Sequence, residues 1–210
     1  MFHKSPEIIL PNTLSLLEII TADQMFSDFF LVGGTALSLQ IGHRQSIDLD
    51  LFTIEPYDVP LLQEYLTNKY NFYTDRTGIN TLIGHIGDVK TDFVTHSASL
   101  VNPLLTKDNL RMASLHDIAA MKLNAISQSG KRLKDFIDVF CLLEIMPFRK
   151  MLEAYEIKYP NSNPIIPIRA VTYFGDIDFN MDKPVMIKKV PIKKMKERLI
   201  KAVQKPNTIF

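Results

Sequence analysis

Two neighbouring segments carry most of the information in this sequence: Phe30-Leu-Val-Gly-Gly-Thr-Ala-Leu37 and Gly42-His-Arg-Gln-Ser-Ile-Asp-Leu-Asp-Leu-Phe52. The residues before the glycine pair, 29–32, are apolar and predict a short buried strand. Gly33-Gly34 predicts a turn, and the apolar residues of 35–41 recur at helical spacing. The first segment is therefore predicted to be a strand, a turn and the first turns of a helix.

The predicted glycine turn has the features of an anion site. Glycine lets the backbone approach a phosphate closely, and the free amides of a first helical turn point outward. Thr35 could cap this turn or donate its hydroxyl. The segment contains neither G-x-G-x-x-G nor G-x-x-x-x-G-K-[ST], so a dinucleotide site and a Walker P-loop lose their main support. A plain tight turn is the alternative.

Two aspartates in the second segment, Asp48 and Asp50, alternate with apolar residues in a run that is typical of a strand. A strand places alternate side chains on one face, so both carboxylates are expected to point the same way. They would repel each other without a cation, and Mg²⁺ or Mn²⁺ is the usual partner of oxygen ligands and phosphates. The alternative is an edge strand with a solvated acidic face. Just before this pair, Arg44 could reach a phosphate or could equally be a surface charge.

Further along the chain, two predicted helices carry charges among apolar residues. The largely apolar pattern of 115–127 includes Lys122, which could extend to water or donate to a phosphate. In the next helix, Asp135 and Asp138 are three residues apart and share a face. Their partners could be turn amides, a nucleotide-bound metal, an acceptor hydroxyl, or Lys122. Nearby basic residues are further candidates: Lys131, Arg132 and Lys134.

In this order and spacing, the Gly-Gly-Thr-Ala-Leu, Gly-His-Arg-X-Ser and Asp-X-Asp-Leu-Phe runs resemble the nucleotidyltransferases of the AbiEii/AbiGii toxin family, of the polymerase-β-like superfamily. Residues 113–126 are similar to the family's central helix, and 134–143 to its Lys-Asp-X-X-Asp helix. Residues 171–176 resemble a tyrosine-phenylalanine-acid segment near the end of many members. The resemblance covers residues 26–180.

The resemblance implies an α+β fold, in which a polymerase-β-like nucleotidyltransferase domain with a mixed sheet precedes a mainly helical C-terminal half. It implies an enzyme that transfers a nucleoside monophosphate from an NTP to an acceptor hydroxyl and releases pyrophosphate, with Mg²⁺ or Mn²⁺ as cofactor. The acceptor it implies is an RNA, particularly the 3′ end of a tRNA. It also implies the toxin of a toxin–antitoxin or phage-defence system, with a cognate antitoxin as a partner.

The resemblance also assigns roles to individual residues. The superfamily usually adds a third carboxylate on a neighbouring strand, for which Asp92 is the candidate and Asp88 the fallback. The implied metal ligands are Asp48, Asp50 and Asp92. The implied catalytic residues are these three with Lys122 and Asp138. The implied nucleotide-binding residues are Gly33, Gly34, Thr35, Arg44, Ser46, Lys122, Lys134 and Asp135.

Two other kinds of function stay open at this point. A nucleotidyltransferase could modify a protein or a small molecule in place of RNA. A non-catalytic module on the same fold could instead bind RNA or a partner protein.

The bulk composition fits these interpretations without choosing among them. The chain has 210 residues, is 46% hydrophobic and carries a formal net charge of +1, so it has no global attraction to nucleic acid or to an anionic membrane. Without an apolar run of membrane-spanning length or a signal-peptide core, a cytoplasmic protein with no membrane contact is expected. The single cysteine, Cys141, excludes an intramolecular disulfide and is predicted to be a buried core thiol.

A basic segment lies near the C-terminus, where residues 181–205 hold nine Lys or Arg residues against two acidic ones. It could contact an RNA backbone, or it could be the solvated face of a helix. Five prolines in 160–191 predict that the chain before it is loop-like or extended.

The remaining pattern gives the expected organisation of the chain. It predicts helices at 12–28 and 58–70, and two or three strands in 72–97. Beyond residue 110 the apolar period becomes helical, and helices are expected to residue 157. We therefore expect a nucleotidyltransferase catalytic domain at 1–105, and a helical domain at 106–210 that completes the active-site cleft and ends in the basic tail.

Overall fold

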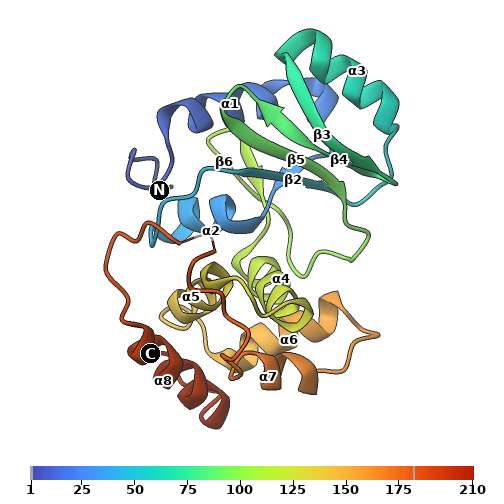
Figure 1. The fold of residues 1–210 in the computed structure, drawn as a ribbon. Coiled ribbons are helices and arrows are strands. Elements are labelled where there is room, and N and C mark those ends of the chain that lie inside the picture. The colour runs from blue at the N-terminus through green and yellow to red at the C-terminus, as the bar shows by residue number, and fades with distance from the viewer. Residues whose placement is uncertain (1, 182) are drawn as a thin grey trace. The chain divides into compact units, whose positions relative to one another are not determined.

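The computed structural model describes residues 2–181 and 183–210, which divide into two compact units (Figure 1). The first unit consists of Met1–Gly42, Ser46–Ser99 and Pro103–Ala113. The second consists of His43–Gln45, Leu100–Asn102 and Ser114–Phe210. The second unit thus includes two short segments, 43–45 and 100–102, whose neighbours in sequence belong to the first. The first unit continues past residue 105 to Ala113; the two predicted domains stay a prediction.

The first unit is a mixed sheet with helices packed on it. Its helices are α1 (Pro11–Ala22), the 3-10 helix η1 (Gln24–Phe26), α2 (Gly33–Ile41) and α3 (Val59–Tyr70). Its strands are β1 (Phe30–Leu31), β2 (Leu49–Thr53), β3 (Phe72–Gly78), β4 (Thr81–Ile86), β5 (Val89–Thr95), β6 (Leu105–Lys107) and β7 (Leu110–Met112). They form one sheet in the order β3-β4-β5-β2-β1-β7-β6. The β2–β5 and β1–β7 pairs are parallel and the others antiparallel, so the predicted mixed sheet is confirmed.

An aromatic cluster fixes which face of β5 is buried in the core of this unit. Phe93 stacks on Phe26 with ring centroids 5.4 Å apart, and meets Phe29 and Phe72 edge to face. Burying each such ring stabilises the fold by about 1.5–3 kcal/mol. Because strand side chains alternate, the core position of Phe93 places the preceding residue, Asp92, on the other face of the sheet.

Local signals explain where the helices of this unit begin and end. The Asp58 side chain accepts a hydrogen bond from Leu61 N at 2.9 Å and caps α3, which ends at Asn71 in the left-handed conformation. The helix predicted for 58–70 is therefore confirmed. The helix predicted for 12–28 is too long, because the Asp23 side chain accepts from Met25 N and starts the separate 3-10 turn.

The second unit is helical, with α4 (Leu115–Gln128) packed on α5 (Leu133–Leu142), α6 (Phe148–Lys158) and α7 (Ile165–Ala170). The last helix, α8 (Ile192–Gln204), packs on α5. Cys141 of α5 is buried, as predicted, and burial raises the pKa of its thiol to about 12.

The strands β6 and β7 lie at and just beyond the predicted domain boundary at residue 105, and β7 pairs with β1. One sequence interpretation is wrong here. The stretch rich in proline contains the helix α7, with Pro167 inside it. Pro167 is the third residue of this helix, where the backbone N–H would have no partner within the helix, so proline costs little there.

Candidate functional site

The glycine pair forms the first turn of α2 and lies against the Asp50 carboxylate. Gly33 has a φ of +69°, which favours glycine, and a Cβ atom there would lie 2.2 Å from Asp50 Oδ2. Val32 N donates to Asp50 O at 2.9 Å, which holds the start of the helix beside β2. Position 33 therefore has no room for a side chain. The sequence predicts a glycine turn before the helix, whereas in the structure the helix α2 already begins at Gly33.

Thr35 and Ser46, both predicted to bind nucleotide, are buried and bonded to each other. Their hydroxyl oxygens are 3.0 Å apart, and Thr35 Oγ1 also donates to the carbonyl oxygen of Asp48. The Thr35 side chain does not cap α2. Its contacts hold α2 against the segment that precedes β2, next to Asp48 and Asp50.

Asp50 and Asp92 are in register on the neighbouring parallel strands β2 and β5, so their side chains project from the same face. Lys90 Nζ lies 2.6 Å from Asp92 Oδ2. Burial of the Lys90 ammonium opposes its charge, but the carboxylates of Asp92, Asp50 and Asp48 outweigh this and raise the pKa of Lys90. One lysine thus lies within the field of all three carboxylates that were predicted to bind metal.

The donor set fits a hard divalent cation. In the part of the chain that the structure describes, no group of three His, Cys, Asp or Glu side chains is already arranged around one point. However, Asp92 Oδ1 is buried and has no hydrogen-bond partner among the described residues. A buried carboxylate oxygen without a partner costs free energy, and an oxygen-preferring cation beside Asp50 would satisfy it.

The fallback residue for the third carboxylate, Asp88, lies elsewhere. It is exposed in the turn between β4 and β5, whereas Asp92 is paired in register with Asp50. The geometry therefore favours Asp92.

The second unit holds a buried network of charges around Asp138, whose side chain is fully buried. Asp138 Oδ1 accepts from Arg44 Nε at 2.7 Å and from His43 Nε2 at 2.8 Å. Asp138 Oδ2 accepts from Arg44 Nη2 at 3.0 Å and lies 2.7 Å from Lys122 Nζ. Lys122 Nζ also donates to Asp135 Oδ1 at 2.7 Å. The residues of this network come from α4, α5 and the segment 43–45.

The charges of this network stabilise one another. Burial alone would raise the pKa of Asp138, but Lys122 and then Arg44 hold it well below its ordinary value. Burial would lower the pKa of Lys122, but Asp138 and Asp135 raise it. Two cations therefore face two carboxylates, and the cluster is close to neutral with His43 uncharged.

These contacts overturn two simpler interpretations. Arg44 is not a surface charge, because it is only 3% exposed. Lys122 does not extend to water, because it is buried between Asp135 and Asp138. The contacts recorded for the two α5 carboxylates among the described residues are with Lys122 and the segment 43–45. Lys134 lies half-buried in the first turn of α5.

His43 was missed by the sequence analysis. Its only sequence signal was its place beside Arg44 in the Gly-His-Arg-X-Ser run. Because Asp138 is ionised, His43 Nε2 must carry the proton in their hydrogen bond. His43 Nδ1 is then an acceptor, and it is buried without a partner in the described residues.

The two short segments of the second unit each complete a buried carboxylate. The segment 43–45 brings His43 and Arg44 to Asp138. The segment 100–102 brings the backbone amides of Val101 and Asn102 to Asp117, at 2.9 and 3.2 Å. Asp117 lies in the first turn of α4, and it also accepts from Lys158 Nζ at 3.0 Å. Asp117 is therefore a structural residue.

The burial of His43 predicts a change of stability with pH. Burial lowers the pKa of His43 below 6.5 and outweighs Asp138, which raises it. When the pKa of a group is lower in the folded protein than in the unfolded chain, its contribution to stability is complete above the pKa of the unfolded chain. That contribution is lost as the pH falls towards the pKa of the folded protein. Between pH 7 and pH 5, the free energy of unfolding should fall more steeply for the wild type than for His43→Gln, which cannot titrate. Urea unfolding at several pH values measures both slopes, and equal slopes would contradict the argument.

Known proteins include several that are similar to this chain. The family model described as "Nucleotidyl transferase AbiEii toxin, Type IV TA system" matches residues 15–208. An uncharacterized protein of Aquifex aeolicus (strain VF5) is 31% identical over 169 residues, which cover 76% of this chain and 80% of that protein.

Solved structures show the same fold at low identity. MenT4, a nucleotidyltransferase toxin from Mycobacterium tuberculosis H37Rv, is similar with a TM-score of 0.61 at 13% identity, over 90% of this chain and 79% of that one. JHP933 from Helicobacter pylori is similar with a TM-score of 0.56 at 14% identity, over 93% of this chain and 90% of that one. The predicted α+β nucleotidyltransferase fold is confirmed. None of the helices in residues 2–181 and 183–210 has the length and apolar character to cross a membrane.

Proposed function

Because the chain belongs to the AbiEii nucleotidyltransferase toxin family, we propose that it transfers a nucleoside monophosphate from an NTP to a hydroxyl of an RNA, in particular at the 3′ end of a tRNA. Nucleotidyl transfer and the link to a toxin–antitoxin system follow from the family and the fold. The RNA acceptor, the need for Mg²⁺ or Mn²⁺, a cognate antitoxin and the roles of individual residues are our additions.

The proposal depends most on one observation: Asp50, which lies against the first turn of α2, is in register with Asp92, whose buried Oδ1 has no hydrogen-bond partner among the described residues. Asp48, Asp50 and Asp92 would hold the cation, which supplies charge neutralisation at the triphosphate as pyrophosphate leaves. Lys90 supplies positive charge to these carboxylates. Their mutual repulsion in the protein is thereby reduced.

In the first unit, the amides of Gly33 and Gly34 would bind phosphate oxygens at the start of α2. Thr35 and Ser46 would act through their observed contacts, by holding this turn against the chain that enters β2. Their buried hydroxyls favour this positioning role over direct contact with the nucleotide.

In the second unit, Lys122 is the residue that we expect to contact phosphate. An ammonium has three N–H donors, and Asp135 and Asp138 accept two of them, so a third can serve a phosphate oxygen. Asp138, Asp135 and Arg44 would orient Lys122 by fixing its position in the buried network. Lys134, at the start of the same helix as Asp138, is the second candidate for a phosphate contact.

Incubation of the protein with α-labelled NTPs, total RNA and Mg²⁺ tests the acceptor. We expect label on RNA of tRNA size, sensitive to ribonuclease and resistant to protease, and absent when EDTA replaces Mg²⁺. The Asp48→Ala/Asp50→Ala variant is the negative control. Label that follows protein or small molecules would contradict an RNA acceptor, and transfer that survives EDTA would contradict the metal site.

A further inference from the structure

Part of the buried network is also held by a stretch of backbone near the C-terminus, Val185–Ile187, which is called the strap below. Gln45 N donates to the carbonyl oxygen of Val185 at 2.8 Å, and Ile187 N donates to the carbonyl oxygen of His43 at 3.1 Å. The strap is therefore paired with the same short segment that supplies two donors to the network.

The pairing determines which side chain of the strap faces the network. Arg44 and Met186 lie opposite each other in an antiparallel bridge, so their side chains lie on the same face. Met186 is half-buried, whereas Val185 is 62% and Ile187 40% exposed. The outer two residues of the strap thus act on the segment 43–45 through their backbone groups and not through their side chains.

The chain that carries the strap is anchored beside α5 at both ends. Before the strap, Asp178 N donates to the carbonyl oxygen of Lys131 at 3.0 Å, and Asp178 forms a parallel bridge with Arg132, the residue before α5. After the strap, α8 packs on α5, where Arg198 Nη1 donates to the carbonyl oxygen of Phe140 at 3.0 Å. Both anchors therefore lie beside the helix that carries the central carboxylate of the network.

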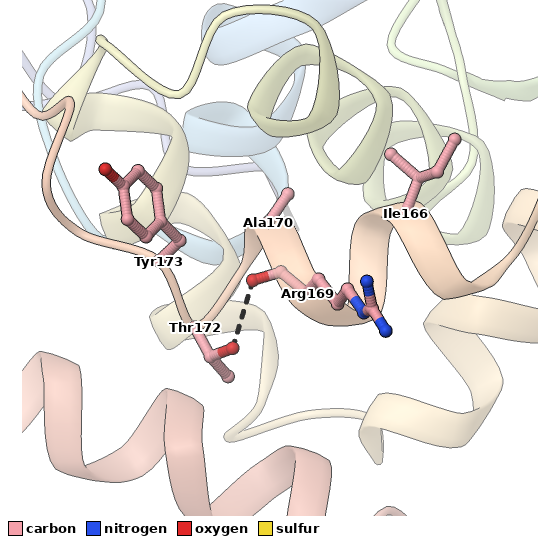
Figure 2. Close-up of a pocket in the computed structure, with 5 residues that line it drawn as sticks. All are labelled: Ile166, Arg169, Ala170, Thr172 and Tyr173. Atoms are coloured by element: carbon pink, nitrogen blue, oxygen red, sulfur yellow. Dashed lines mark hydrogen bonds between the residues drawn. The ribbon is translucent and has the colours of Figure 1, made fainter.

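The chain reaches its first anchor through the turn at the end of α7 (Figure 2). Thr172 Oγ1 donates to the carbonyl oxygen of Arg169 at 3.0 Å, which fixes this turn. The turn borders a pocket of about 570 Å³, and none of the residues that line this pocket belongs to the buried network. Beyond the turn, the Phe174 ring packs on the Phe136 ring of α5, with centroids 5.8 Å apart. The turn thus directs the chain onto α5 before the strap begins.

A continuous series of contacts leads from the strap to Lys122. The strap holds the segment 43–45, Arg44 donates to both oxygens of Asp138, and Lys122 Nζ lies 2.7 Å from Asp138 Oδ2. If Arg44 were withdrawn, Asp138 and Asp135 would share a single cation. The network would then change from nearly neutral to net negative, which would repel a phosphate and bind the ammonium more tightly to the protein.

We propose that the strap is a positioning element for nucleotide binding: it keeps Arg44 in the buried network, and thereby leaves Lys122 able to donate to a phosphate of the NTP. The inference rests on the phosphate contact of Lys122 in the proposed function, and it makes that contact dependent on the C-terminal segment. The positioning residues are Val185, as an acceptor, and Ile187, as a donor, through their backbone groups.

Ile187→Pro tests the strap, because proline has no N–H to donate to His43. It should weaken the binding of an α,β-methylene NTP in Mg²⁺, with whichever base the wild type binds best, by about tenfold. Two controls are matched: Ile187→Ala keeps the N–H, and Lys189→Pro places a proline at a neighbouring exposed position. Both should bind within about twofold of the wild type. Wild-type affinity in Ile187→Pro would overturn the proposal.

A double-mutant cycle separates positioning from a general loss of stability. If the strap acts through Arg44, Ile187→Pro should weaken nucleotide binding no further in an Arg44→Met background. Melting temperatures are measured in parallel, because a merely structural role would lower them without changing the affinity of the folded protein. A second loss of about tenfold in the Arg44→Met background would mean that the strap acts by another route, and the proposal would be wrong.

Amide exchange of the wild type tests the same coupling without any substitution, and so does not depend on the folding of Ile187→Pro. Coupling between two sites is reciprocal, so saturation with the NTP analogue should slow exchange of the Ile187 and Gln45 amides by about tenfold. The matched amide is Arg149 N, which donates to the carbonyl oxygen of Pro206 at 2.8 Å and should change by less than about twofold. Unchanged exchange at Ile187 and Gln45 would contradict the proposal.

Lys122→Met separates this proposal from the proposed function. If this variant binds the analogue as tightly as the wild type, the strap has no phosphate contact to position and the proposal is overturned. If Lys122→Met and Ile187→Pro both weaken binding but the wild type labels no RNA, the RNA acceptor is wrong and the strap stands. If the wild type labels RNA and Ile187→Pro binds the analogue like the wild type, the strap is wrong and the function stands.

Discussion

Asp138→Asn should lower the free energy of unfolding by about 3–5 kcal/mol, because it leaves buried cations without their shared counter-charge. The Asp138 side chain is fully buried and is bonded to Arg44, His43 and Lys122. Its pKa is well below 3.8, so this carboxylate contributes its stability at every pH above that value and loses it only in stronger acid. Urea unfolding at pH 7 measures the loss.

Two further variants isolate the cause of that loss. Asp138→Asn/Lys122→Met removes one charge of each sign and leaves Arg44 with Asp135. Its destabilisation should therefore be smaller than the sum of the two single substitutions. Glu153→Gln, which removes an exposed ion pair, should leave the urea midpoint unchanged. Additive effects at Asp138 and Lys122 would show that the network is not coupled.

Asp50→Asn should lower the rate of nucleotidyl transfer by about 10³-fold, equivalent to about 4 kcal/mol of charge stabilisation by a bound cation. Asp50 is the carboxylate that lies both against the first turn of α2 and in register with Asp92. The matched control is Asp88→Asn in the exposed turn before the same strand, which should keep the wild-type rate. A single-turnover assay at saturating NTP measures both.

A measurement without catalysis separates this loss from misfolding. Removing Asp50 relieves repulsion with Asp92, so the variant should be at least as stable as the wild type in EDTA. Added Mg²⁺ should raise the melting temperature of the wild type, because it binds the folded state, and should not raise that of Asp50→Asn. An equal rise in both proteins would place the cation elsewhere.

Much of the fold could be predicted from periodicity and local signals. The strand, glycine pair, helix and strand of 29–53 form as expected, and three strands follow within 72–97. The strands β6 and β7 could not be predicted, because each has only three residues and β7 exists through its pairing with β1, far away in sequence. α7 was missed because proline was taken as a helix breaker, whereas Pro167 occupies the first turn.

Likewise, only some residues of the candidate site could be predicted from the sequence. Asp48 and Asp50 are recognisable from a strand pattern, and Asp92 from the resemblance to a family. Lys122 could be named as a candidate partner of Asp138, but His43 and Arg44 could not, because they are 95 and 94 residues away from it. Periodicity indicates that a carboxylate on an apolar helix needs a partner, but it does not indicate which distant segment supplies that partner.

The segments 43–45 and 100–102 have a consequence for how this protein can be divided or recombined. Each is covalently part of the sheet half, yet each completes a buried carboxylate of the helical half. A fragment that begins at Ser114 would carry Asp138 and Asp117 without these donors. The helical half is therefore not a transferable module: it cannot be cut out, expressed alone or exchanged between relatives without the two short segments that are encoded before it.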